Sequence, residues 1–151
     1  MDRDNADNES ADLTQAEPPQ RNWPEGAVIV SVCTTCKTAD GGEVVGPAMF
    51  AAVQAALGNE DANVIVRPVQ CLSVCTRPAT VAVTSPDGYT FLFGDLQTGS
   101  GTAALASFVK SYRNSDYGLV PWRERAEVLR KGMLARVPPT RWSPDDGRAP
   151  K

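Results

Sequence analysis

The chain contains no histidine among its 151 residues. This absence excludes mixed cysteine–histidine zinc sites and any mechanism that uses histidine as its general base. No apolar run approaches the roughly 20 residues that a membrane-spanning helix needs. The N-terminus also lacks the basic start and the apolar core of a secretory signal. The sequence therefore predicts a cytoplasmic protein that does not engage a membrane.

Clustered positive charge is missing as well. Residues 1–25 hold seven acidic and two basic side chains, whereas the remainder holds eleven acidic and thirteen basic ones. The net charge is −3, and no basic cluster is interleaved with aromatic residues, so nothing indicates nucleic-acid binding. Because residues 1–25 contain several prolines and show no hydrophobic periodicity, we predict a disordered acidic leader there.

The apolar pattern over residues 26–115 predicts one α/β domain. An almost unbroken apolar run at 27–32 is typical of a buried strand. Gly46-Pro47 opens a predicted helix that ends near Gly58. The other predicted elements are strands at 63–66, 80–84 and 89–93, the last two forming a hairpin, and a helix at 101–112. The order β-α-β-β-β-α indicates a thioredoxin-like architecture with a four-stranded mixed sheet. Alternation of Tyr89, Phe91 and Phe93 predicts that these rings share one face in the core.

Residues 116–151 are predicted to form a C-terminal helical extension of that domain. Apolar side chains recur along one stripe of a predicted helix at 121–133, namely Trp122, Ala126, Leu129 and Met133. Pro138-Pro139 would stop such a helix. The residues after these prolines are predicted to be disordered, so the extension is only partly helical.

All four cysteines lie where predicted strands end. Cys33 and Cys36 follow the first strand, and Cys71 and Cys75 follow the second. Because neighbouring parallel strands end at the same edge of a sheet, we expect the four thiols to come together. A site of four thiolates usually holds zinc or an iron–sulfur cluster. Paired cysteines in the cytosol more often bind metal or perform redox chemistry than form structural disulfides.

Three kinds of cysteine chemistry compete for the spacing Cys-x2-Cys and Cys-x3-Cys. A dithiol enzyme would place Cys33 and Cys36 at a helix N-terminus, but residues 37–42 start a helix poorly and the second pair would stay unexplained. Structural zinc suits the first pair better than the second. A [2Fe-2S] cluster puts two thiolates on each iron and tolerates mixed spacing. The spacing therefore favours a [2Fe-2S] cluster held by Cys33, Cys36, Cys71 and Cys75, with zinc and thiol redox chemistry as the alternatives.

These cysteines, on a β-α-β-β-β-α frame, resemble those of the thioredoxin-like [2Fe-2S] ferredoxins, in which the first pair is more widely spaced. The chain is also similar, over residues 27–139, to a bacterial family of predicted metal-binding proteins. The matching phrases are Val32–Cys36, Cys71–Cys75 with Arg77-Pro78, Gly94–Leu96, and Trp122–Arg125 through Leu134–Pro139. This second resemblance implies a role in cobalamin biosynthesis or cobalt handling.

A one-electron carrier is predicted rather than an enzyme, because no histidine and no nucleophile outside the cysteines stands out. Its predicted partner is a redox protein, either a reductase or an electron-accepting enzyme, and a homodimer is one candidate assembly. A zinc-stabilised binding module or metallochaperone is the alternative function. Lys37, Arg67 and Arg77 flank the cysteines and are predicted to offset the negative charge of a four-thiolate cluster.

Overall fold

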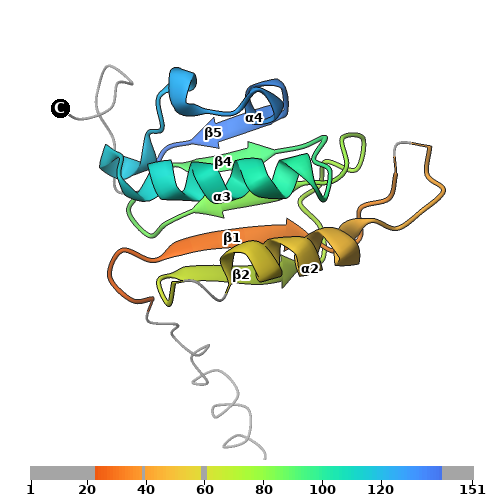
Figure 1. The fold of residues 1–151 in the computed structure, drawn as a ribbon, viewed down its shortest axis with the longest axis horizontal. Coiled ribbons are helices and arrows are strands. Elements are labelled where there is room, and N and C mark those ends of the chain that lie inside the picture. The colour runs from red at the N-terminus through yellow and green to blue at the C-terminus, as the bar shows by residue number, and fades with distance from the viewer. Residues whose placement is uncertain (1–22, 39, 59–60, 141–151) are drawn as a thin grey trace, which may run out of the picture.

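The structure is a computed structural model that describes residues 23–38, 40–58 and 61–140. These residues form a mixed α/β fold around a five-stranded sheet with the strand order β2-β1-β3-β4-β5 (Figure 1). Residues 1–22 of the predicted leader lie outside the described residues. Residues 141–151, for which disorder is predicted, lie outside them as well.

The interior strand β1 (Val28–Cys33) organises the sheet, and all six of its residues are buried. It pairs in parallel with the edge strand β2 (Val64–Val69) and antiparallel with β3 (Val81–Thr84) on its other side. A hairpin joins β3 to β4 (Thr90–Phe93). The predicted mixed sheet and the predicted hairpin are therefore confirmed.

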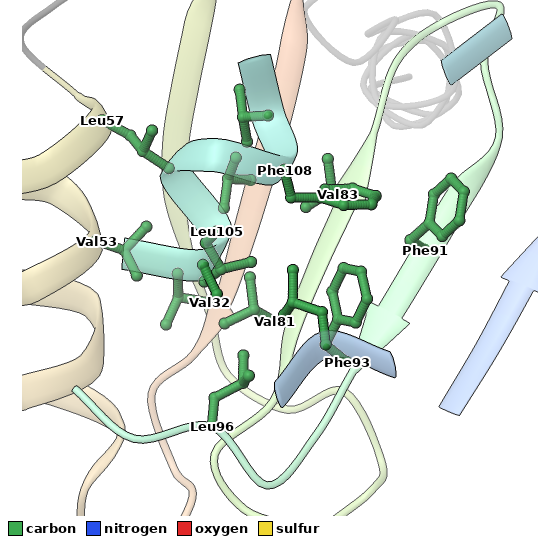
Figure 2. Packing of buried hydrophobic residues seen from close by; sticks show 14 of the residues in the cluster. Val32, Val53, Leu57, Val81, Val83, Phe91, Phe93, Leu96, Leu105 and Phe108 are labelled. Atoms are coloured by element: carbon green, nitrogen blue, oxygen red, sulfur yellow. The ribbon is translucent and has the colours of Figure 1, made fainter. Parts of the chain in front are cut away.

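Helices α2 (Gly46–Leu57) and α3 (Ser100–Arg113) lie on the same face of the sheet (Figure 1). Figure 2 shows side chains from the strands and from α3 meeting in the core between them. The Phe108 ring packs edge-on against Phe91 and Phe93, with centroids 5.1 and 5.0 Å away. Tyr89, which directly precedes β4, is also part of the core, so the predicted burial of all three rings is confirmed. No helix in the described part of the chain is long and apolar enough to span a membrane.

The C-terminal segment overturns two predictions. The sheet has five strands rather than four, because β5 (Met133–Val137) pairs antiparallel with β4. The continuous helix predicted at 121–133 is absent from the described chain. The segment instead contains the 3-10 turns η1 (Asp116–Gly118) and η2 (Trp122–Glu124) and the five-residue helix α4 (Glu127–Lys131).

Tertiary contacts explain why the predicted helix is interrupted. Arg125 has extended backbone angles, and its buried guanidinium donates two hydrogen bonds to the carbonyl of Val120, at 3.0 and 2.8 Å. Gly132 then ends α4 against Gly94, whose amide donates to the Gly132 carbonyl at 2.8 Å. A Cβ atom on Gly132 would lie 2.4 Å from the Gly94 oxygen, so only glycine permits this approach. The chain thereby turns into β5.

Candidate metal centre

The first cysteine pair lies at the end of β1 and in the tight loop that follows. Cys33 is the last residue of β1, and the carbonyl of Cys36 accepts hydrogen bonds from the amides of Val45 and Gly46, at 2.8 and 3.2 Å. A Cβ atom on Gly46 would lie 2.3 Å from the carbonyl carbon of Thr34. Glycine therefore lets α2 begin directly against the loop. This packing leaves Cys33 and Cys36 only 1% and 2% exposed.

The second pair lies in the loop after β2, and both of its thiols are exposed. The amide of Ser73, a residue with φ of 62°, donates a hydrogen bond to Cys71 Sγ at 3.1 Å. Farther along the loop, the Arg77 guanidinium forms an ion pair with Asp95, in the segment after β4. The second pair thus lies in a surface loop, and the ion pair between Arg77 and Asp95 holds the end of this loop against the segment after β4.

The structure brings all four predicted ligands to one edge of the sheet. Cys33 Sγ lies 3.7 Å from the carbonyl oxygen of Gln70, directly before the second pair, and Cys33 is opposite Val69 at the end of β2. Contact with Cys71 raises the pKa of the Cys75 thiol, and charge on Cys33 adds to this effect. The two pairs are therefore neighbours, as their positions at parallel strand ends predict. Their binding of a metal stays a prediction.

The donor set of this site consists of two thiol pairs. Cys33 and Cys36 lie at the end of β1 and in the loop after it, and Cys71 and Cys75 lie in the loop after β2. Within the described ranges, no three histidine, cysteine or acidic side chains surround a single metal position. Zinc needs four thiolates converging on one ion, whereas a two-iron cluster takes two thiolates on each iron. Four cysteine thiols in two neighbouring pairs supply the donors that either group takes.

The buried thiols differ in how readily they ionise. Burial raises the pKa of the Cys33 thiol, but hydrogen bonding with Thr35, with Cys36 and with the backbone outweighs burial and lowers the pKa to about 7. Burial raises the pKa of Cys36, and the hydrogen bond with Thr80 only partly offsets this effect. The Cys33 thiol therefore ionises more readily than the Cys36 thiol.

The three basic residues predicted to flank the cysteines have different surroundings. Lys37 is exposed and forms no ion pair within the part of the chain that the structure describes. Arg67 Nε donates to Ser31 Oγ at 2.7 Å. Arg77 is paired with Asp95, so much of its charge is offset. The predicted offset of cluster charge therefore rests on Lys37 and Arg67 more than on Arg77.

Sequence reasoning missed Thr80 and Asp95 as members of the site. Thr80 is 0% exposed, its carbonyl accepts a hydrogen bond from the Cys33 amide at 3.1 Å, and its Oγ1 lies 3.5 Å from Cys36 Sγ. A polar residue at the start of the apolar run Val81–Val83 was a usable signal for Thr80. Asp95 pairs with a residue 18 positions away, and no local pattern indicates that contact.

Comparison with known proteins adds a family and one structural similarity. The family model described as "Protein of unknown function (DUF1636)" matches residues 30–139. No curated protein matches the chain. A solved structure of a thioredoxin-like [2Fe-2S] ferredoxin from Aquifex aeolicus is similar at 16% sequence identity and a TM-score of 0.49, covering 77% of this chain and 98% of that one. Neither comparison mentions cobalamin or a bacterial origin for this chain.

Proposed function

Since the match over residues 30–139 makes this chain a member of the DUF1636 family, we propose a function from the site itself. The protein is a one-electron carrier that holds a [2Fe-2S] cluster through Cys33, Cys36, Cys71 and Cys75. One observation carries this proposal, namely that the two cysteine pairs follow the ends of the parallel strands β1 and β2, where Cys33 is opposite Val69 and its Sγ lies 3.7 Å from the Gln70 oxygen. The cluster, when bound, supplies the uptake and release of a single electron.

The chain holds and tunes such a group with its strands and its hydrogen-bond donors. Cys33 and Cys36 would bind from the core side, and Cys71 and Cys75 from the solvent side. The amide of Ser73 donates to Cys71 Sγ, and the hydroxyl oxygen of Thr35 lies 3.6 Å from Cys33 Sγ. Donors to sulfur stabilise negative charge there and adjust the reduction potential. These contacts already exist before any metal binds.

The second pair, Cys71 and Cys75, is the outer pair because both residues are exposed, and this exposure supports a carrier rather than an enzyme. A redox protein, either a reductase or an electron-accepting enzyme, can approach Cys71 and Cys75 directly. The link to cobalamin synthesis or cobalt handling rests on the resemblance alone and stays a prediction, which the cobalamin yield of a deletion strain would test. The cytoplasmic location and the homodimer also stay predictions.

Metal and sulfide analysis tests the proposal. Protein purified without oxygen should contain about two irons and about two inorganic sulfides per chain, and dithionite should make it paramagnetic by adding one electron. Reconstitution with iron and sulfide should give the same content in protein that lost its cluster in air. Stoichiometric zinc without sulfide, in protein from iron-replete cells, would replace this proposal with the zinc-stabilised binding module.

A further inference from the structure

Three threonine hydroxyls lie beside the cysteines, and each has a single proton to donate. Thr34 Oγ1 donates to the carbonyl of Val69 at 3.1 Å. Thr35 Oγ1 donates to the carbonyl of Gln70, so its oxygen, 3.6 Å from Cys33 Sγ, can donate to that sulfur only by releasing the carbonyl. Both hydroxyls therefore join the loop of the first pair to the end of β2.

Thr80 is arranged differently from the other two threonines. Its side chain is fully buried, and Cys36 Sγ, at 3.5 Å, is the partner of its hydroxyl within the described residues. A buried hydroxyl without a partner is costly, so this contact is retained when the sulfur changes state. A cysteine thiolate bound to metal has no proton to give. Thr80 must then be the donor and Cys36 the acceptor.

We propose that Thr80 is a positioning residue that raises the reduction potential of the bound cluster by donating a hydrogen bond to Cys36 Sγ. This inference rests on the proposed function. Reduction adds one electron from an external one-electron donor and no proton, so negative charge on the ligating sulfurs increases. A hydrogen-bond donor stabilises the more negative state more strongly, and the potential rises.

The backbone of Thr80 also contacts the site, and this contact does not depend on the side chain that the test replaces. Its carbonyl accepts a hydrogen bond from the Cys33 amide at 3.1 Å, which braces the other buried cysteine. A change of side chain keeps this backbone contact. Valine has nearly the shape of threonine without the hydroxyl, and serine keeps the hydroxyl. Thr80→Val and Thr80→Ser therefore separate donation to sulfur from filling of the core.

The experiment compares midpoint potentials in three variants of the full chain loaded with iron and sulfide. Thr80→Val should make reduction about tenfold less favourable, which corresponds to about 59 mV for one electron. Thr80→Ser should stay close to the unchanged protein. Thr34→Val is the matched control, because it removes a hydroxyl that donates to a carbonyl. It should lower the melting temperature and leave the potential unchanged.

Equal potentials in Thr80→Val and the unchanged protein would overturn the inference, as would an equal shift in Thr34→Val. Thr80→Ala replaces Thr80→Val in the comparison with Thr80→Ser if the valine variant does not retain iron. Iron and sulfide are measured first in the unchanged chain. Their absence there refutes the proposed function together with this inference, whereas their presence with an unshifted potential refutes the role of Thr80 alone.

Discussion

The two cysteine pairs have nearly the same spacing and opposite surroundings. Cys33 and Cys36 are 1% and 2% exposed and belong to the hydrophobic core beneath α2. Cys71 and Cys75 are exposed in a loop beyond the end of β2. The inner pair is fixed by a buried strand and by the first turn of a helix, whereas the outer pair is fixed by its loop. Cysteine is therefore part of the hydrophobic core in the first pair and part of the protein surface in the second pair.

Because of this difference, the effect of a substitution on stability can be measured apart from its effect on metal binding. A change at the inner pair alters core packing as well as the donor set, because both thiols contact buried side chains. A change at the outer pair alters the donor set and leaves the core as it was. Stability of the metal-free protein and retention of metal should thus respond differently at the two pairs.

The largest expected effect is the loss of the cluster in Cys36→Ser and in Cys75→Ser. Serine oxygen matches iron less well than thiolate, so both variants should retain far less iron and sulfide than the unchanged protein. In the metal-free protein, Cys36→Ser should lower the free energy of unfolding by about 1–2 kcal/mol, because it changes a buried group. Cys75→Ser should leave it unchanged, as urea unfolding would show.

Either of two results would contradict this prediction. Normal iron content in Cys75→Ser would show that the ligand set is wrong. An equal loss of stability in the metal-free forms of both variants would show that the outer pair also supports the core.

A smaller effect is expected from Gly46→Ala, which crowds the inner pair without touching a thiol. The added Cβ would lie 2.3 Å from the carbonyl carbon of Thr34, so backbone must move. Overpacking of this kind costs about 1–3 kcal/mol. Iron release to a chelator should also become faster. Gly99→Ala is the control, because that position is open and the change should cost under about 1 kcal/mol. Equal effects of the two substitutions would mean that α2 does not constrain the loop.

Most of the sheet could be predicted from the sequence because its signals are local. The apolar run at 27–32, the turn residues at 85–88 and the helix opening at Gly46-Pro47 each specify an element without help from distant residues. The fifth strand could not be predicted in this way. Its first residue, Met133, also completes a helical stripe, and the deciding contacts, Arg125 with Val120 and Gly132 with Gly94, form only when the chain is folded.

The site shows the same division between local and tertiary information. The positions of the cysteines after two strands predict that the four thiols meet, and the structure places them together. Which pair is buried could not be predicted, because burial depends on the packing of α2 against Thr34. The partial neutralisation of Arg77 by Asp95 also depends on a contact between two loops.

The smallest expected effects come from the charges beside the outer pair. Arg77→Gln leaves Asp95 unpaired near the cysteines and should lower the midpoint potential slightly, whereas Asp95→Asn should raise it slightly. The double variant should lie close to the unchanged protein. Because the pair is exposed, these shifts should shrink as salt rises from about 0.01 M to about 1 M. The shift in Thr80→Val should persist, because that contact is buried. If the potential shifts of the Arg77, Asp95 and Thr80 variants all shrank equally with salt, surface charge would set the contribution of both cysteine pairs to the potential.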